Sequence, residues 1–472
     1  MPELPEVETV RATLVRQIVG EKIVNVIINY PNIIQEMTPV EFKRKLINQK
    51  VEKISRYGKY LFFIFNDVSL ISHLRMEGKY FIKDKTEYIN KHEHIIFEFE
   101  SGRTLRYHDT RKFGTMKIVD TTIFDEIMKE KELARLGKEG IDVTLTGLEL
   151  YNKIKTKMIP IKTALLDQTI ICGLGNIYVD EVCFLSKIHP TTPCKFITKY
   201  KCDEIVKHSK IVLKNAIKAG GTTIRSYTSS LGVTGRFQIN LLVHTKESKP
   251  CQICDTIINK IQVGGRGTYF CPVCQPEKKK IIVGITGGIA CGKSSVSTYL
   301  TSLKYCVIDA DIISKDLTKP EGAALKQIKE TFGEEYFDNG MLNREKLGKL
   351  IFSDPVSNQL LTSIIHPLVF KEIVKQIDES MSDVVFIDVP LLFESNFDSL
   401  CNYVMCVVAK EELVIERLMA RDSIDADYAM KKIKSQMDIN LKKQKSHFII
   451  DNSYELCYTY KQIDDALSKI LK

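Results

Sequence analysis

Four cysteines stand in two closely spaced pairs, Cys251 with Cys254 and Cys271 with Cys274. Two thiol pairs of this spacing, each on a hairpin turn, are typical of one Zn²⁺ in a closed tetrahedral site. A closed site has no open position for a substrate, so we expect one structural zinc ion per chain. Two disulfides are the alternative, and the other nine of the thirteen cysteines are expected to be small core residues.

A phosphate-binding motif lies in the second half of the chain. Residues 287–294 read GGIACGKS and fit the pattern G-x-x-x-x-G-K-[ST]. Glycines allow backbone N–H groups to turn toward a phosphate at the start of the next helix. We expect Lys293 to bridge phosphates of ATP and Ser294 to hold Mg²⁺.

Two pairs of charged residues could complete that site. Asp309 and Asp311 follow the apolar run 305–308, and a carboxylate after a parallel strand lies where ligands bind and could accept a proton from an attacking hydroxyl. A helix cap is the alternative for one of them. Arg417 and Arg421 are four residues apart and share one helix face, from which they could close over ATP. A solvated face is the alternative for these arginines.

The N-terminus offers a nucleophile. The chain begins Met1-Pro2-Glu3, and removal of Met1 would expose the secondary amine of Pro2. An α-amino group titrates near ~8, far below the ~10.4 of lysine, so part of it is neutral and nucleophilic at pH 7. Glu3 could exchange protons with this amine or with a substrate. A terminus without chemistry is the alternative.

Two kinds of element would position these residues. After a helix over 4–18, runs rich in Ile, Val, Phe and Tyr predict an antiparallel sandwich or barrel, and a helical part follows over about 123–220. The predicted strands are 22–30, 51–66, 68–82, 94–100 and 103–119. From residue 281, apolar strands alternate with helices, which predicts an α/β fold with a parallel sheet. These strands are 281–285, 305–308, 384–389 and 403–408.

The net charge of +9 is unevenly distributed. Residues 1–280 carry 45 Lys and Arg against 31 Asp and Glu, and residues 281–472 carry 23 against 28. We therefore expect a polyanion as partner of the first part and a small ligand for the second. At 44% hydrophobic residues the chain is not disordered, and no apolar run approaches the ~18 residues of a membrane span. The acidic start is not a secretory signal, so we expect a cytoplasmic protein without membrane contact.

Six segments of the C-terminal part form a set that resembles dephospho-coenzyme A kinase. They are ITGGIA (285–290), IDADII (308–313), HPL (366–368), DVPLLFE (388–394), ERLMARD (416–422) and IDNS (450–453). The resemblance implies transfer of the γ-phosphate of ATP to the 3′-hydroxyl of dephospho-CoA, the last step of CoA synthesis. It makes Asp311 the base and Arg417 and Arg421 residues of a lid. Lys315 stands where the family often has Arg. A lysine keeps the positive charge of this contact on the acceptor side but holds its partner in a less defined geometry.

The same resemblance assigns ligand contacts, among them Asn452 near adenine. The residues implied for ATP are Gly287, Gly288, Ala290, Cys291, Gly292, Lys293, Ser294, Ser295, Arg417, Arg421 and Asn452. Those implied for the CoA precursor are His366, Leu391, Leu392 and Phe393.

A second set of segments, together with the cysteine hairpin, resembles formamidopyrimidine-DNA glycosylase over about residues 1–275. These segments are PELPEVETV (2–10), RYGKYL (56–61), HLRMEG (73–78), RYHDTRKFG (106–114), LLDQ (165–168), GLGNIYVDE (173–181) and GGTT (220–223). The resemblance implies a β-sandwich, a helix–two-turns–helix module around 146–220 and a four-cysteine zinc finger, with damaged double-stranded DNA in the cleft between them.

The resemblance also implies a reaction. An oxidised purine, chiefly 8-oxoguanine or a formamidopyrimidine, is flipped out of the duplex. Pro2 attacks C1′ of the deoxyribose and displaces the damaged base. A Schiff base forms between Pro2 and the sugar, and Glu3 acts as acid/base. Then β- and δ-elimination cut the strand, with Lys59 as acid/base for the first step and Arg266 assisting the second. Because Arg is a poor proton donor, we interpret Arg266 mainly as a phosphate clamp.

Further residues are carried over as DNA contacts. Met76, Arg111 and Phe113 match the set that fills the gap left by the flipped base, and such wedges kink DNA. The residues implied as backbone contacts are Lys59, His92, Lys112 and Asn176, and residues 222–237 match a loop that covers the lesion.

The chain departs from this pattern at three positions. Thr110 and Lys112 stand where Pro and Arg are common, which weakens a bidentate phosphate contact. Met158 stands where the family often has a DNA-contacting lysine, so Lys157 or Lys162 would substitute.

We therefore expect a monomeric fusion of two enzymes. The expected domains are a sandwich (1–130), a helix–two-turns–helix domain (131–225), the loop end and zinc finger (226–277), a linker (278–280) and an α/β P-loop kinase domain (281–472). Three alternatives stay open. The first part could prefer oxidised pyrimidines, as endonuclease VIII does, although the gap-filling set argues against this; it could bind DNA without catalysis; and the second part could phosphorylate another acceptor.

Overall fold

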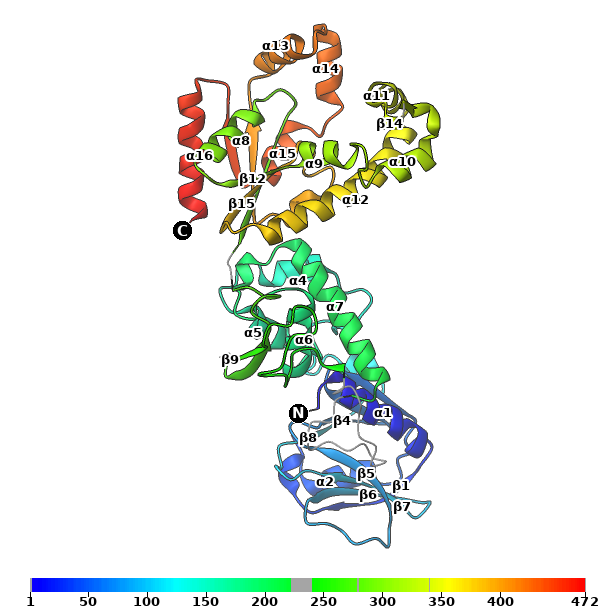
Figure 1. Ribbon diagram of the computed structural model, residues 1–472. Coiled ribbons are helices and arrows are strands. Elements are labelled where there is room, and N and C mark those ends of the chain that lie inside the picture. The colour runs from blue at the N-terminus through cyan, green and yellow to red at the C-terminus, as the bar shows by residue number, and fades with distance from the viewer. Residues whose placement is uncertain (1, 222–239, 278–279, 339, 472) are drawn as a thin grey trace. The chain divides into compact units, whose positions relative to one another are not determined.

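The computed structural model describes residues 2–221, 240–277, 280–338 and 340–471 (Figure 1). The chain divides into two compact units, one formed by residues 1–197 and 201–277 and the other by residues 198–200 and 278–472. Within the described residues, no helix is both long and apolar enough to cross a membrane. The predicted lesion-covering loop, 222–237, and most of the predicted linker lie outside the described residues.

The first unit begins with helix α1 (Leu4–Ile18), as predicted. Its apolar side chains recur every three or four residues, which places Val7, Val10 and Leu14 on one buried face. Pro5 is tolerated because a proline in the first turn removes an N–H that has no helical partner.

Two four-stranded antiparallel sheets follow, in the orders β1–β6–β7–β5 and β2–β3–β4–β8. Phe63 and Leu70 of one sheet and Tyr80 and Phe97 of the other belong to one buried core, so the sheets form a sandwich. The strands are β1 (Ile23–Ile28), β2 (Lys53–Tyr57), β3 (Tyr60–Ile64), β4 (Ser69–His73), β5 (Lys79–Asp84), β6 (Glu93–Phe99), β7 (Arg103–His108) and β8 (Thr115–Val119), with helix α2 (Pro39–Leu46) after β1.

The helical part of this unit has its own core. The helices are α3 (Phe124–Ile127), α4 (Gly147–Ile154), α5 (Ile161–Leu166), α6 (Asn176–Leu185) and α7 (Lys199–Lys218). Thr146 caps α4 by accepting the Glu149 N–H at 3.2 Å, and the Glu149 carboxylate accepts the Thr146 N–H at 2.9 Å. A hairpin of β9 (Asn259–Val263) and β10 (Arg266–Phe270) follows, turning at Gly264 and Gly265, whose φ values of 54° and 73° suit a tight turn.

The second unit contains a five-stranded parallel sheet in the order β12–β15–β11–β16–β17. Alternate residues of β15 face opposite cores: Phe386 packs with α8 and α16, whereas Ile387 packs with α9 and α12. Helices therefore cover both faces of the sheet. The strands are β11 (Ile281–Gly287), β12 (Cys306–Asp309), β15 (Val384–Asp388), β16 (Tyr403–Val408) and β17 (Phe448–Asp451). The strand prediction missed β17.

The remaining elements of the second unit surround this sheet. The helices are α8 (Lys293–Ser302), α9 (Ala310–Leu317), α10 (Leu325–Phe332), α11 (Arg344–Ser353), α12 (Pro355–Glu379), α13 (Glu411–Asp422), α14 (Ala426–Lys434), α15 (Ile439–Lys445) and α16 (Leu456–Ile470). A two-stranded ribbon pairs β13 (Phe337–Asp338) with β14 (Met341–Leu342).

Candidate functional site

The Glu3 carboxylate lies at the N-terminus of α6. Its Oε1 accepts the N–H of Ile177 at 3.3 Å, whereas its buried Oε2 has no partner among the described residues. Glu3 is 4% exposed, and Pro2 beside it is buried. A Cβ on Gly175 would come within 2.0 Å of the Glu3 carboxyl carbon, so only glycine allows this approach. Burial raises the pKa of Glu3 to about 7, although Lys59 opposes the shift.

Glu6 fixes the start of α1 against α6. Its carboxylate accepts the Glu3 N–H at 2.9 Å and the Tyr178 hydroxyl at 2.6 Å. The backbone at Pro2–Glu3 is therefore tied to the helical part, which places the predicted nucleophile and acid in one fixed position.

Lys59 approaches the same place from the turn between β2 and β3. Its side chain is buried, Nζ donates to the Leu174 carbonyl at 2.8 Å, and burial lowers its pKa. Glu3 opposes that shift and Arg266 adds to it, so all three predicted residues share one electrostatic environment. The structure thus brings Glu3 and Lys59 together, and the strand of Arg266 reaches the same helix, because the Gly267 carbonyl accepts the Asn176 amide at 3.1 Å.

An ion-pair network supports the Lys59 turn. Arg56 donates to Glu8 at 3.0 Å and to the Gly58 carbonyl at 3.0 Å, and it also contacts Glu139. Glu139 in turn accepts the Gly58 N–H at 2.6 Å. Gly58 has a φ of 58°, and a Cβ there would lie 2.3 Å from the buried Cys172 sulfur. Sequence patterns showed none of these pairings.

A buried lysine holds the Arg266 strand in place. Lys162 is fully buried, pairs with Asp180 at 2.7 Å and donates to the Gly267 carbonyl at 3.1 Å. Asn176 donates to the same carbonyl at 3.1 Å. The prediction that Lys162 could contact DNA is therefore wrong, because its ammonium is enclosed by the hairpin and α6. Lys157 is exposed and stays a prediction.

The predicted gap-filling residues lie on two turns. Phe113 is 52% exposed, and the Arg111 guanidinium lies 4.8 Å from its ring centroid. Met76 is half-buried, and Lys112 lies over the Tyr30 ring at 4.6 Å. An exposed aromatic ring with a cation beside it is typical of a ligand-binding surface.

Asp109 shapes the second of these turns and was missed as a separate functional residue. Its fully buried carboxylate accepts the N–H groups of Arg111, Phe113 and Gly114 at 2.9, 3.0 and 2.9 Å. The signal that could have identified it is an Asp at the start of a turn, because an Asp side chain commonly accepts the backbone N–H two residues further on. His92, another of the predicted DNA contacts, packs edge-on against His108, with the two ring centroids 5.6 Å apart.

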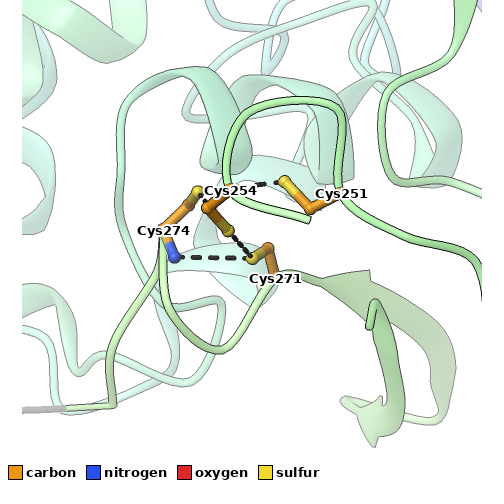
Figure 2. A group of neighbouring side chains, drawn as sticks. All are labelled: Cys251, Cys254, Cys271 and Cys274. Atoms are coloured by element: carbon orange, nitrogen blue, oxygen red, sulfur yellow. Dashed lines mark hydrogen bonds between the residues drawn. The ribbon is translucent and has the colours of Figure 1, made fainter. Parts of the chain in front are cut away.

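The four predicted zinc ligands lie together, as Figure 2 shows. Their sulfur atoms all lie within 4.8 Å of one another. The sulfur of Cys254 lies 3.4 Å from that of Cys271 and 3.5 Å from that of Cys274, and the sulfurs of Cys251 and Cys274 are 3.9 Å apart. Tetrahedral zinc with Zn–S bonds of ~2.3 Å requires sulfurs about 3.8 Å apart. These residues therefore fit one Zn²⁺, and they are too far apart for disulfides.

In the second unit, the glycine-rich loop joins β11 to α8 at the carboxyl edge of the parallel sheet. Gly292 has a φ of 87°, and a Cβ there would lie 2.0 Å from the Asn452 amide nitrogen. Ser294 and Ser295 occupy the first turn of α8, and the Lys293 ammonium contacts Asp388 at the end of β15. This is the arrangement that a phosphate-binding loop needs.

Asp388 is the residue of this site that the sequence analysis left without a function. Its carboxylate contacts Lys293 and accepts the Ser297 hydroxyl at 2.5 Å. Asp309 caps α9 by accepting the Asp311 N–H at 2.8 Å, which settles that one of the two aspartates is a cap. Burial raises the pKa of Asp311, and Lys293 opposes the shift.

The predicted lid arginines both lie on α13. Arg417 donates to the Asn452 carbonyl at 3.3 Å, and Arg421 donates to Asp422 at 2.8 Å. The Asn452 side chain is buried: it donates to the Cys291 carbonyl at 3.0 Å and accepts the Thr459 hydroxyl at 2.9 Å. Asn452 therefore supports the phosphate-binding loop, and its contact with adenine stays a prediction.

The four residues predicted for the CoA precursor differ in their exposure. Leu391 is partly exposed, Phe393 is half-buried beneath Lys445 at 5.6 Å, and His366 packs against Phe397 at 6.1 Å. Leu392 is fully buried in the core. Its side chain fills the space beside the sheet, and its contact with the CoA precursor stays a prediction.

Comparison with known proteins identifies both units. Family models match residues 1–116 (formamidopyrimidine-DNA glycosylase N-terminal domain), 136–228 (its H2TH domain) and 248–276 (zinc finger found in FPG and IleRS). The formamidopyrimidine-DNA glycosylase of Oceanobacillus iheyensis is 45% identical over 282 residues, which are 60% of this chain and 100% of that protein. That of Ureaplasma parvum is 46% identical over 277 residues, 58% of this chain and 100% of the relative.

The chain belongs to the formamidopyrimidine-DNA glycosylase family. Solved structures of the Lactococcus lactis member cover 58% of this chain and 100% of their own at a TM-score of 0.55. They include a mutant with Fapy-dG containing DNA and a complex with abasic-site DNA, both at 40% identity, and the wild type with oxidised-pyrimidine DNA at 39%. Residues 281–457 match the dephospho-CoA kinase model, so this glycosylase-family chain also carries a kinase domain.

Proposed function

We propose that this chain is a bifunctional enzyme. Residues 1–277 would excise oxidised purines from DNA and cut the strand at the resulting site, and residues 281–472 would phosphorylate the 3′-hydroxyl of dephospho-CoA. The observation that carries the first activity is the pair of buried side chains beside Pro2: the Glu3 carboxylate held by the Ile177 N–H, and the Lys59 ammonium held by the Leu174 carbonyl. The one that carries the second is the contact of Lys293 with Asp388 beside the glycine-rich loop.

The glycosylase step would begin at Pro2. After Met1 is removed, its neutral amine attacks C1′ of the deoxyribose, and the bond from C1′ to the base breaks. Glu3, which its raised pKa keeps partly protonated near neutrality, supplies the proton that the leaving base needs. The amine then gives up its remaining proton, the C1′–O4′ bond breaks and O4′ takes up a proton, so that an iminium (the Schiff base) links Pro2 to the opened sugar.

Strand cleavage would use the neighbouring cations. The iminium accepts electrons when C2′ loses a proton, and the 3′-phosphate then leaves. Lys59 suits this exchange because burial lowers its pKa and its Nζ is fixed by the Leu174 carbonyl. Arg266, on the hairpin braced by Lys162 and Asn176, would hold phosphate oxygens through the second elimination.

DNA recognition would rest on the basic surface of this unit. Arg111 and Phe113, on the turn shaped by Asp109, would enter the gap left by the flipped base together with Met76. His92, Lys112 and Asn176 would contact the backbone. The zinc ion, bound by the four cysteines, would hold the hairpin that carries Arg266.

The kinase step would use the carboxyl edge of the parallel sheet. Backbone N–H groups of residues 287–292 and the Lys293 ammonium would bind the phosphates of ATP. Asp311 would take the proton of the 3′-hydroxyl, and Arg417 and Arg421 would offset the charge on the transferred phosphoryl group. Ser294 and Asp388 offer the oxygen ligands that Mg²⁺ prefers, and the ion would neutralise phosphate charge.

The repair activity is tested by borohydride trapping. We expect full-length protein to form a covalent adduct with 8-oxoguanine duplexes and Pro2→Gly protein to form none. An adduct that persists in Pro2→Gly would reject Pro2 as the nucleophile. If wild-type protein forms no adduct, the alternative that the first unit binds DNA without catalysis would be favoured.

Substrate choice is a separate measurement, because a relative's structure contains an oxidised pyrimidine. We expect faster single-turnover excision of 8-oxoguanine than of thymine glycol, and the reverse order would reject the purine assignment.

The kinase activity is tested by ADP release with and without dephospho-CoA. We expect the acceptor to stimulate release and a 3′-phosphorylated product to form. ATP consumption that does not respond to dephospho-CoA would mean a different acceptor.

A further inference from the structure

The phosphate-binding loop of the kinase domain is held by a segment that neither the sequence motifs nor the proposed reaction uses. The N–H of Ile289, in the middle of the loop, donates to the side-chain oxygen of Gln436 at 3.0 Å. Gln436 lies two residues after the end of α14, and α14 is joined to the predicted lid helix α13. A lid residue thus reaches the backbone that would surround the ATP phosphates.

Helices α13 and α14 are tied to each other by one carboxylate. Asp422, at the end of α13, accepts Arg421 at 2.8 Å and Lys432 of α14 at 2.8 Å. The predicted ATP-binding Arg421 and the segment that ends in Gln436 are therefore linked through Asp422. A movement of either helix would therefore be transmitted to the other through the Asp422 contacts.

The chain after Gln436 is anchored beneath the loop. Met437 donates its N–H to Glu394 at 3.2 Å, and Glu394 pairs with the fully buried Lys442 at 2.9 Å. Lys442 also donates to the carbonyls of Pro390 at 3.1 Å and Gly287 at 3.5 Å. The 436–442 segment therefore contacts the loop at two backbone groups, Gly287 O and Ile289 N.

We propose that Gln436 is a positioning residue that couples the α13–α14 lid to the phosphate-binding loop. Its neutral amide holds the Ile289 N–H, so that the loop and the lid arginines adopt their ATP-binding positions together. The inference rests on the proposed kinase function for its context, but it concerns ATP affinity and is tested on that quantity.

Charge explains why an amide is needed at this position. A carboxylate would accept the same N–H, but it would place a negative charge beside the phosphates of ATP. The charged groups around it are Glu394 and Lys442 below the loop and Lys293 and Asp388 beside it. Lys442 and Lys293 are already paired with carboxylates, so an added anion would meet no free cation among these four groups.

The experiment measures ATP binding to the full chain by calorimetry, at pH 8 and pH 5.5. For Gln436→Ala, which removes the acceptor, we expect affinity to fall about five- to tenfold at both pH values. For Gln436→Glu we expect at least about a tenfold loss at pH 8 and a loss of similar size at pH 5.5, because a carboxyl with the ordinary glutamate pKa of ~4.3 stays mostly ionised at both pH values. Gln327→Glu on α10, an exposed position, controls for added charge and should bind ATP as wild type does.

Two outcomes would overturn the inference. Wild-type affinity in Gln436→Glu at pH 8 means that the contact is incidental. Weak affinity in Gln436→Glu together with a lower melting temperature of the ATP-free protein means a general structural defect. If wild type binds ATP but dephospho-CoA does not stimulate ADP release, the proposed kinase function fails while the test of Gln436 remains valid.

Discussion

Glu3 Oε1 accepts the Ile177 N–H at 3.3 Å, while its second carboxylate oxygen is buried without a partner among the described residues. One half of the carboxylate is thus fixed at the positive end of α6, and the other is left for a proton or a substrate. Burial is the main reason that the pKa of Glu3 rises to about 7.

The raised pKa predicts how stability depends on pH. An unfolded Glu loses its proton near pH 4.5, whereas native Glu3 keeps it until about pH 7. The native state therefore loses stability as pH rises from 4.5 to 7, and above 7 the cost levels off at roughly 3 kcal/mol. We expect Glu3→Gln to raise the melting temperature of the first unit at pH 8 and to raise it much less at pH 5.5. An equal effect at both pH values would contradict this.

The same carboxyl predicts a pH profile for base excision. The leaving base needs protonated Glu3, whereas the Pro2 amine, with a pKa near ~8, must be neutral. We expect the single-turnover rate on 8-oxoguanine DNA to peak near neutral pH and Glu3→Gln to lose excision while retaining DNA binding. A rate that stays constant from pH 6 to 9 would argue against Glu3 as the acid.

Asp109 makes a prediction about DNA recognition. Its buried carboxylate accepts three backbone N–H groups of the turn that carries Arg111 and Phe113. We expect Asp109→Ala to lower stability by about 2–4 kcal/mol and to weaken binding to abasic-site DNA, because the turn loses its shape. Urea unfolding and DNA titration measure the two effects. Asp125→Ala, at an exposed position on α3, is the matched control and should change neither.

Local patterns predicted the elements and the motif residues well. The spacing of apolar residues in α1, the glycine-rich loop and the two cysteine pairs are each specified by a few neighbouring positions. Strand β17 was missed because its four residues are too few to define a period.

Side-chain partners far apart in the sequence could not be predicted in the same way. Lys162 looks like any basic residue until α6 supplies Asp180 as its partner. Within the Leu391–Phe393 run, only the packing decides that Leu392 faces the core. The role of Gln436 likewise depends on a distant backbone group, the Ile289 N–H, that folding brings near.

The four-cysteine site predicts separate responses of the two units to metal removal. Structural zinc contributes folding free energy directly, so loss of the ion should unfold the hairpin that carries Arg266. We expect one zinc per chain by elemental analysis. We also expect a chelator, or Cys271→Ser, to abolish strand cleavage while ATP affinity stays unchanged. Retained cleavage in metal-free protein would contradict a structural zinc.

Asp388 carries the last prediction, because it joins the Lys293 ammonium to the Ser297 hydroxyl at the end of β15. Asp388→Asn keeps the size of the side chain and removes the charge that holds Lys293 and could help bind Mg²⁺ with ATP. We expect kcat for dephospho-CoA-dependent ADP release to fall at least about 100-fold, with fold and DNA cleavage unchanged, since DNA cleavage uses residues of the first unit. Steady-state kinetics and a nicking assay on one preparation measure both activities. A kcat within a few fold of wild type would mean that Asp388 has only a structural part in the loop.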